Sequence, residues 1–204
     1  GHVGTLVAQM AREKGYEVLL NVPPRQSGDY NQLCQLGEVC SLNEIAQRAD
    51  IITFHTPLNL TGEFPTFHLC NRQFLSDCKP KVVIINAARG GILDENDALL
   101  KEHAQKTFII DTWAMEPHIN QIMLQRAFLA TYHIAGYSRH GKVNATNMCL
   151  EALCSYFGLP LLQVDESLLP PQPQLTVDWI RQVDKQLRQY PDRFDSLRAD
   201  YPLR

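Results

Sequence analysis

The chain has 204 residues and a mass of 23.2 kDa, with 45% hydrophobic residues, 20% charged residues and a formal net charge of -3. This composition is typical of a globular protein with one full core and room for a small appendage. Asp and Glu (22) outnumber Lys and Arg (19), so we expect no nucleic-acid partner; no apolar run approaches the roughly 20 residues that cross a bilayer, so we expect no membrane partner.

The six cysteines form no C-x-x-C pair, and the sequence therefore gives no support for a zinc site or a redox motif. We expect no metal site. No signal-peptide pattern is recognised, and reduced thiols in the cytoplasm are the expectation.

Helical and strand patterns alternate along the chain. Ser41 with Glu44 forms a capping box, and Asn71 and Asp94 are side chains of the kind that begin helices. We expect helices over 4–14 (with Gly15 as its C-cap), 41–48, 71–78, 94–103, near 119–126 and over 141–157. We expect strands over 17–21, 50–54, 81–86, 107–111 and around 129–134. A loop through Pro23, Pro24, Ser27 and Gly28 follows the first of these strands.

The predicted strands are apolar throughout and are separated by helices, which is typical of a parallel sheet covered on both faces. The fold class is therefore α/β with a doubly wound parallel sheet, in a domain over 1–158. A Pro-rich linker over 159–173 follows, and 174–204 carries two short amphipathic helices of a further domain. Since the chain opens on what resembles half a motif, we expect a fragment that lacks the first strand and is inactive and marginally stable by itself.

Ligands of open parallel sheets bind beyond the carboxyl ends of the strands. Several residues with catalytic or binding chemistry follow predicted strands in this sequence. They are Asn21 and Val22, the stretch 55–58, the stretch 88–91 with Arg89, Asp111 with Glu116, and His133 with Gly136 and Tyr137.

Three of these residues together suit hydride transfer at a hydroxyl-bearing carbon. Arg89 offers a planar fork for a substrate carboxylate, His133 can pass a proton near neutral pH, and Glu116 can hold the His133 imidazole. Taken singly, each has an ordinary alternative: a surface arginine, a satisfied loop histidine and a carboxylate at a helix start.

The nucleotide signal is weaker. Gly1 and Gly4 match the last two glycines of G-x-G-x-x-G, whose backbone N–H groups hold a pyrophosphate, although a plain helix entry has the same appearance. Asp111 can accept a hydrogen bond from a nicotinamide carboxamide, with a helix cap as its alternative.

These segments resemble the D-isomer-specific 2-hydroxyacid dehydrogenases, with a Rossmann-like domain that binds NAD. The resemblance is carried by Gly1-x-x-Gly4, by 86–91 with Asp94-Glu95 and Ala98-Leu99, by 111–113 with Glu116-Pro117, and by 133–136. It implies that Arg89, Glu116 and His133 are catalytic and that Thr56, Asp111 and Gly136 contact the cofactor. The stretches 54–69 and 133–142 resemble members that act on a small phosphorylated hydroxy acid. In those members Tyr137 would contact substrate through its hydroxyl and 174–204 would begin a dimerisation domain, so that a homodimer is expected.

One departure concerns the cofactor. The family places an acidic residue before two prolines after the second strand, where it holds the ribose 2′-hydroxyl and repels a 2′-phosphate. Here Val22 stands at that position, with Asn21 before it as a partial substitute and Arg25 nearby. NAD remains the expected cofactor, and NADP is left open.

Two other functions are also left open. One is another enzyme of the family, of the 3-phosphoglycerate or glyoxylate/hydroxypyruvate type. The other is a nucleotide-sensing module without catalysis, although all three catalytic residue types are present.

Overall fold

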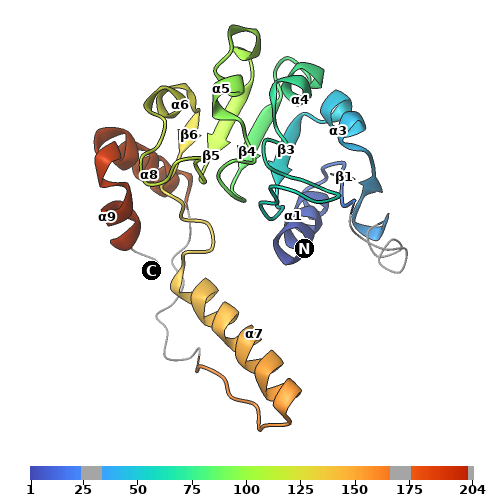
Figure 1. Cartoon of the computed structure of the whole chain (residues 1–204), viewed down its shortest axis with the longest axis vertical. Coiled ribbons are helices and arrows are strands. Elements are labelled where there is room, and N and C mark those ends of the chain that lie inside the picture. The colour runs from blue at the N-terminus through green and yellow to red at the C-terminus, as the bar shows by residue number, and fades with distance from the viewer. Residues whose placement is uncertain (24–33, 166–175, 202–204) are drawn as a thin grey trace. The chain divides into compact units, whose positions relative to one another are not determined.

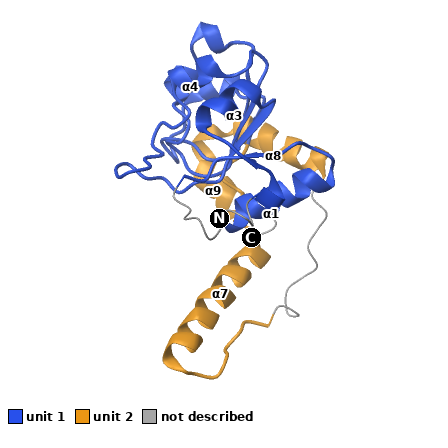
Figure 2. Cartoon of the chain, turned by 90° about the vertical axis from the view of Figure 1, so that its right-hand side faces the viewer, with its two compact units in different colours: residues 1–130 blue, residues 131–204 orange. Residues whose placement is uncertain are grey.

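The computed structural model describes residues 1–23, 34–165 and 176–201. The chain divides into two compact units, 1–130 and 131–204 (Figure 2). The loop residues Pro24, Arg25, Ser27 and Gly28, and the part of the expected linker from 166 to 173, lie outside the described residues.

The described strands of the first unit are all parallel and form two sheets. β1 (Leu19–Leu20) pairs with β2 (Glu38–Val39). A second sheet has the order β3-β4-β5-β6, formed by β3 (Ile51–Phe54), β4 (Val83–Asn86), β5 (Thr107–Ile110) and β6 (Leu129–Ala130). The strand register aligns Ile51 with Val83, Val83 with Thr107, and Ile109 with Leu129. This architecture confirms the predicted α/β parallel fold.

Helices join the strands of this unit. They are α1 (His2–Glu13), α3 (Leu42–Arg48), α4 (Arg72–Asp77), α5 (Glu95–Ala98), the 3-10 turn η1 (Lys101–His103) and α6 (Gln121–Arg126). Figure 1 shows α3, α4, α5 and α6 in a row beside the strands, and neighbours in this row contact each other. Buried side chains such as Leu75, Ile84, Ile92 and Phe108 form the core between the helices and the strands.

The predicted helix starts are confirmed where a capping side chain marks them. Ser41 and Glu44 form both bonds of the capping box. Asn71 caps α4 and Asp94 caps α5, and each accepts backbone N–H groups of the first turn. A capping side chain of this kind contributes about 1 kcal/mol of helix stability. N-cap residues therefore predict where these helices begin.

Helix α1 begins earlier than predicted. Gly1 is its N-cap, so Gly4 lies inside its first turn rather than being its first residue. Lys14, and not Gly15, is the C-cap; Gly15 follows with φ of 84° and Tyr16 donates to the Ala11 carbonyl, which closes a Schellman motif.

Four further elements differ from the prediction. β2 is only two residues long, which is too short to show a hydrophobic periodicity in the sequence. The helix expected over 94–103 breaks at Leu100, which has an extended backbone. β6 ends at Ala130, which pairs with Ile110, the last residue of its partner β5. The long helix begins at Arg139 because Ser138, not a residue nearer Gly141, caps it.

The second unit is helical. It contains α7 (Arg139–Phe157), α8 (Val177–Gln189), the 3-10 turn η3 (Pro191–Arg193) and α9 (Phe194–Ala199). α8 contacts η3 and α9, as expected for two short amphipathic helices. The Tyr132 hydroxyl lies 3.3 Å from the Gln186 side-chain oxygen, and the Tyr201 ring packs against Tyr132 and Trp179. No helix among the described residues is long and apolar enough to cross a membrane.

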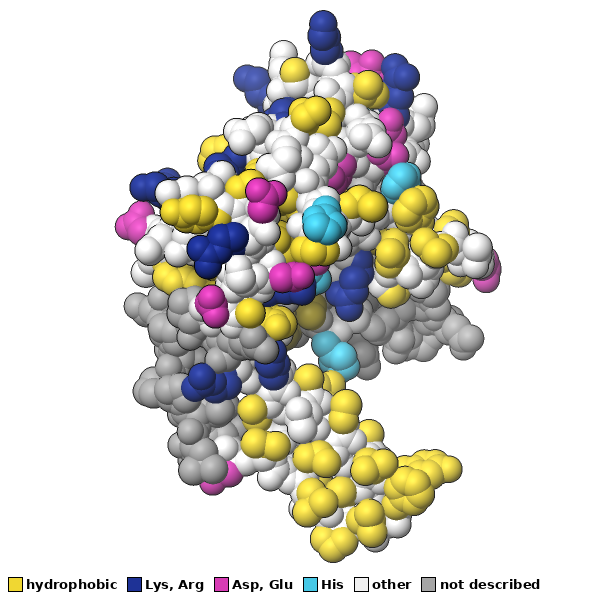
Figure 3. Space-filling view, turned by 60° about the vertical axis from the view of Figure 1, so that its left-hand side comes forward, with side chains coloured by type: hydrophobic (Ala, Val, Ile, Leu, Met, Phe, Trp, Pro, Cys, Tyr) yellow, Lys and Arg dark blue, Asp and Glu magenta, His cyan; other side chains and the backbone are white. Residues whose placement is uncertain are grey.

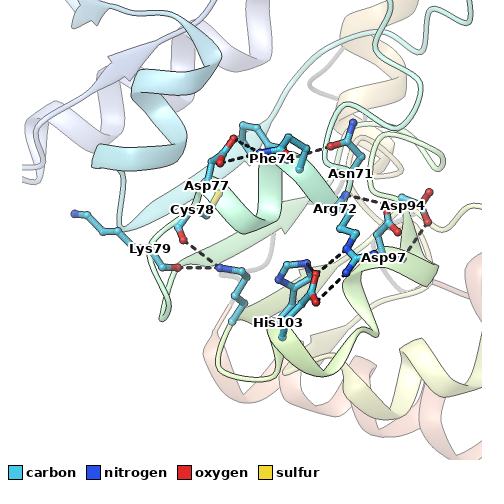
Figure 4. A network of polar contacts seen from close by, with 12 residues as sticks. Asn71, Arg72, Phe74, Asp77, Cys78, Lys79, Asp94, Asp97 and His103 are labelled. Atoms are coloured by element: carbon cyan, nitrogen blue, oxygen red, sulfur yellow. Dashed lines mark hydrogen bonds and ion pairs between the residues drawn. The ribbon is translucent and has the colours of Figure 1, made fainter.

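A polar network joins α4 to η1 and the start of β5 (Figure 4). Lys106 is buried and donates to the carbonyl oxygens of Cys78 and Lys79, at the end of α4. Arg72 pairs with Glu102 at 2.8 Å. His103 is 1% exposed, and its Nε2 has no hydrogen-bond partner among the described residues. The imidazole is buried, with Nε2 3.7 Å from a Glu102 carboxylate oxygen, and its burial opposes the charged form.

We expect this histidine to make the fold sensitive to acid. Burial, followed by the charge of Lys106, lowers the pKa of His103 below its usual 6.5 in the folded chain. As pH falls below 6.5 the unfolded chain takes up a proton there before the folded chain does, so stability falls with it. Urea unfolding at pH 7.5 and 5.5 measures the loss. The loss should be smaller in His103→Leu, and an equal loss in both proteins would assign the acid sensitivity to other groups.

Candidate active site

The candidate site of the first unit lies at the carboxyl ends of β3, β4 and β5. Because these strands are parallel and adjacent, the segments that follow them, 55–58, 87–91 and 111–116, share one edge of the sheet. The structure therefore places Thr56, Arg89, Asp111 and Glu116 at the same edge, as the sequence predicts.

Asn86, the last residue of β4, joins two of these segments. Its side chain is 1% exposed and donates to the carbonyl oxygens of Arg89 (3.0 Å) and Thr112 (3.3 Å). Its carbonyl oxygen accepts the N–H of Asp111 at 2.9 Å. Sequence analysis did not identify Asn86 as a site residue; a buried amide at the end of an otherwise apolar strand is the signal that was available.

Gly90 lets the same two segments approach closely. A Cβ at Gly90 would lie 1.9 Å from the carbonyl oxygen of Trp113. Trp113 is itself buried, so the position tolerates no side chain. Glu95 adds a further tie, since its carboxylate accepts the N–H of Ala114 at 2.8 Å. Burial raises the pKa of Glu95.

The Arg89 side chain is exposed to solvent. Its guanidinium donates to the Ala88 carbonyl at 2.7 Å. Within the described parts of the chain it has no ion pair with a carboxylate. The remaining N–H groups of the fork suit an incoming carboxylate.

Glu116 and Asp111 are held by backbone groups. The carboxylate of Glu116 accepts the Trp113 N–H at 2.8 Å, and the peptide bond between Glu116 and Pro117 is cis. Asp111 is buried. The backbone N–H of Asp111 donates to the Asn86 carbonyl, at the end of the strand that leads into the Arg89 turn.

His133, Gly136 and Tyr137 belong to the second unit and share one turn. His133 has a left-handed backbone (φ 57°), as has Gly136 (φ 74°), and the Tyr137 N–H donates to the Ile134 carbonyl at 2.9 Å. The Lys142 ammonium lies 3.7 Å from the centre of the Tyr137 ring. The structure thus brings together Arg89, Asp111 and Glu116 in one unit and His133, Gly136 and Tyr137 in the other, and the meeting of the two groups stays a prediction.

The expected nucleotide end of the site lies around α1 and β1. Gly1 is the N-cap of α1 and forms no side-chain cap, so the first-turn N–H groups are the candidate partners of a pyrophosphate. Gly4 faces His55, where a Cβ would lie 3.3 Å from the His55 Cβ. These features fit a dinucleotide at this helix.

Asn21 and Val22 follow directly after β1, at the chain position where the family has its ribose-binding acidic residue. Asn21 donates from its side-chain nitrogen to the Cys40 carbonyl at 2.9 Å and so ties β1 to the end of β2. Its side-chain oxygen accepts no hydrogen bond within the described residues. That oxygen is the group available to a ribose hydroxyl.

The described residues contain no group of three or more His, Cys, Asp or Glu side chains placed to hold a metal ion. All six cysteines are free, and four of them, Cys40, Cys70, Cys78 and Cys154, are buried. Burial raises the pKa of the Cys78 thiol to about 11, so at least this thiol stays protonated at neutral pH.

Residues 1–135 match the model of the D-isomer specific 2-hydroxyacid dehydrogenase family, NAD binding domain. The chain therefore belongs to this family of dehydrogenases, and the parallel α/β unit with its glycine-led α1 is part of the family's NAD-binding domain.

Among curated relatives, the chain is similar to erythronate-4-phosphate dehydrogenases. It is 37% identical to that of Bacteroides fragilis over 220 residues, covering 100% of this chain and 61% of the relative. It is 34% identical to that of Coxiella burnetii over 223 residues, covering 100% of this chain and 59% of the relative. The chain thus spans about three fifths of the length of these relatives.

Solved structures agree on the fold. A glyoxylate reductase from Paecilomyes thermophila matches with a TM-score of 0.64 and 24% identity, over 82% of this chain and 50% of the other. The D-lactate dehydrogenase of Lactobacillus jensenii, solved with NAD+, matches with a TM-score of 0.61 and 21% identity, over 81% and 53%.

Proposed function

We propose that the protein oxidises the 2-hydroxyl of 4-phospho-D-erythronate to the 2-oxo acid, with NAD, in the route to pyridoxal 5′-phosphate in the cytoplasm. The observation that carries the proposal is the identity of 34–37% to erythronate-4-phosphate dehydrogenases along essentially the whole chain. The chemistry of Arg89, Glu116 and His133 supports it.

Each of the three residues has a role in the proposed reaction. Arg89 binds the substrate carboxylate through its guanidinium. His133 takes the proton of the 2-hydroxyl, and Glu116 favours the imidazolium that results. NAD, when bound, supplies the acceptor for the hydride that leaves C2. The Tyr137 hydroxyl contacts the substrate, and Asp111, Thr56 and Gly136 contact the cofactor.

NAD is preferred over NADP in this proposal, with a smaller margin than an acidic residue would give. Val22 neither binds the ribose hydroxyls nor repels a 2′-phosphate, and Asn21 offers only its uncharged side-chain oxygen, because its side-chain nitrogen is engaged with Cys40. We therefore expect NAD to be used better, and NADP to be used measurably.

We also propose that the protein is a homodimer. α7 and the segment after it carry apolar side chains that are exposed, which Figure 3 shows as a group over this helix. Among them Met148 is 55% exposed, Phe157 62% and Tyr156 83%. An apolar surface of this kind supports burial against a second copy.

Initial rates on the intact protein test the function. With NAD as cofactor, 4-phospho-D-erythronate is expected to give a kcat/KM at least tenfold above those of 3-phosphoglycerate, D-lactate and D-glycerate. A preference for an unphosphorylated acid or for 3-phosphoglycerate would favour a different dehydrogenase of the same family. Binding of NADH without turnover of any acid would favour a nucleotide-sensing module.

A further inference from the structure

We propose that His68 is a positioning residue for the candidate active site. Together with Asp94 it clamps the loop over 57–69 onto the turn over 89–91, and so holds the turn from which Arg89 projects. This inference rests on the proposed function only where it concerns the role of Arg89 toward substrate.

The backbone of His68 is in an unusual conformation. Its φ is 52°, in the left-handed region that only a few per cent of residues other than glycine adopt, although Asn, Asp and His adopt it more often than the rest. In this conformation its N–H donates to the Gly91 carbonyl at 2.7 Å. A conformation that costs on the order of 1 kcal/mol persists only where surrounding contacts enforce it.

The side chain of His68 supplies one of these contacts. Its Nδ1 lies 2.9 Å from Oδ2 of Asp94, whose side chain is 17% exposed. The other carboxylate oxygen of Asp94 accepts the N–H groups of Asn96 and Asp97 and caps α5. One carboxylate therefore joins the loop to the helix that follows the Arg89 turn.

Phe67 supplies a second contact. Its ring stacks on the His68 imidazole with 3.8 Å between the centroids and 18° between the planes. The same ring covers Gly91, where a Cβ would lie 3.3 Å from two ring carbons. Gly91 has a φ of 80°, so a larger residue there would be both strained and crowded.

Both ends of the loop are fixed independently of His68. Thr66 donates from its hydroxyl to the Pro57 carbonyl and accepts the Asn59 N–H. Beyond the loop, Cys70 donates to the Ile92 carbonyl at 3.0 Å and Asp94 donates back to the Cys70 carbonyl at 3.1 Å. His68 therefore connects two segments that other hydrogen bonds already hold. Removing its side chain is not expected to unfold either segment.

The Arg89 turn is therefore held from two sides. Asn86 and the backbone at Trp113 fix it toward β5, and the clamp formed by His68 and Asp94 fixes it toward β3. A guanidinium that binds a carboxylate with two parallel hydrogen bonds tolerates little displacement, and misplacement by about 1 Å can cost on the order of 100-fold. Release of the clamp should act on substrate binding more than on cofactor binding.

The test uses one variant that removes the clamp and one that removes its charge. His68→Gly removes the side chain and permits the left-handed backbone. Asp94→Asn removes the charge and keeps an oxygen that caps α5, because asparagine is as good an N-cap as aspartate. His68→Asn, which tolerates the same backbone and retains a donor, is the conservative variant. Asp77→Asn on α4, an exposed acid that accepts from Gln73, is the matched control.

In the intact protein we expect His68→Gly and Asp94→Asn to raise KM for 4-phospho-D-erythronate about tenfold or more, while kcat and the Kd of NADH change by less than about threefold. His68→Asn should recover part of the loss, and the double variant should lose no more than His68→Gly alone. Unchanged KM in both variants, or a parallel loss of NADH binding, would overturn the proposal.

Amide hydrogen exchange tests the clamp without any substrate. Exchange should accelerate at residues 66–70 and 89–92 in His68→Gly and Asp94→Asn, and should be unchanged there in Asp77→Asn. Unchanged exchange in these segments would overturn the clamp itself. A different result would separate the two proposals. If the unvaried protein did not oxidise 4-phospho-D-erythronate while exchange was still accelerated in the variants, the proposed function would be refuted and the clamp would be supported.

Discussion

Replacing Gly90 with alanine is expected to destabilise the fold by about 3 kcal/mol or more, in the range of severe overpacking. The added Cβ would lie 1.9 Å from the Trp113 carbonyl oxygen and 2.5 Å from its carbonyl carbon. Both are backbone atoms of a buried segment that Asn86 and Glu116 also hold, so the clash cannot be relieved by a side-chain rotation. Denaturant unfolding of the chain measures the loss.

Glu63→Ala, at an exposed position in the loop that follows β3, is the control for this experiment. It should change the free energy of unfolding by less than about 0.5 kcal/mol, as is usual for surface substitutions. If Gly90→Ala were as stable as the unvaried chain, the close approach of the β4 and β5 segments, on which the placement of Arg89 relative to Glu116 depends, would be wrong.

The second large effect is expected on catalysis. His133→Asn keeps a polar side chain of similar size that tolerates the left-handed backbone, but it removes the imidazole that we propose takes the substrate proton. The kcat of the intact protein should fall by about 100- to 10,000-fold, the usual contribution of a general base. The Kd of NADH, measured by fluorescence, should stay within about threefold, since His133 acts on the proton and not on the nucleotide.

His140→Asn, in the first turn of α7, is the matched control and should keep nearly full activity. A kcat for His133→Asn within tenfold of that of the unvaried protein would remove His133 from the mechanism. An equal loss in both histidine variants would indicate damage to the turn before α7, rather than loss of a base.

Local sequence signals predicted much of the fold. The apolar runs around Ile52, Ile84 and Phe108 became adjacent parallel strands, and the caps at Ser41, Asn71 and Asp94 begin helices as expected. These signals involve residues within one turn or one strand, so they can be recognised without knowledge of the tertiary structure. Two-residue strands such as β2, and the early end of β6, depend on a partner strand and could not be read.

The candidate site was predictable to the extent that it depends on strand ends. Arg89, Asp111 and Glu116 share one edge because each follows a parallel strand. The residues that hold them there were missed, because their contacts join segments far apart in sequence: Asn86 reaches Thr112, Gly90 meets Trp113, and His68 pairs with Asp94. The left-handed backbone of His68 has no local signal either, since the residue is not glycine.

A crystal structure of the intact protein with NADH and 4-phospho-D-erythronate would show whether Arg89, Glu116 and His133 form one active site. The guanidinium of Arg89 is expected within hydrogen-bond distance of the substrate carboxylate. The His133 imidazole is expected within the same reach of the 2-hydroxyl, with the carboxylate of Glu116 against the imidazole and the nicotinamide beside C2. If His133 lay on a face of the molecule away from Arg89 and Glu116, a single active site formed by these three residues would be ruled out.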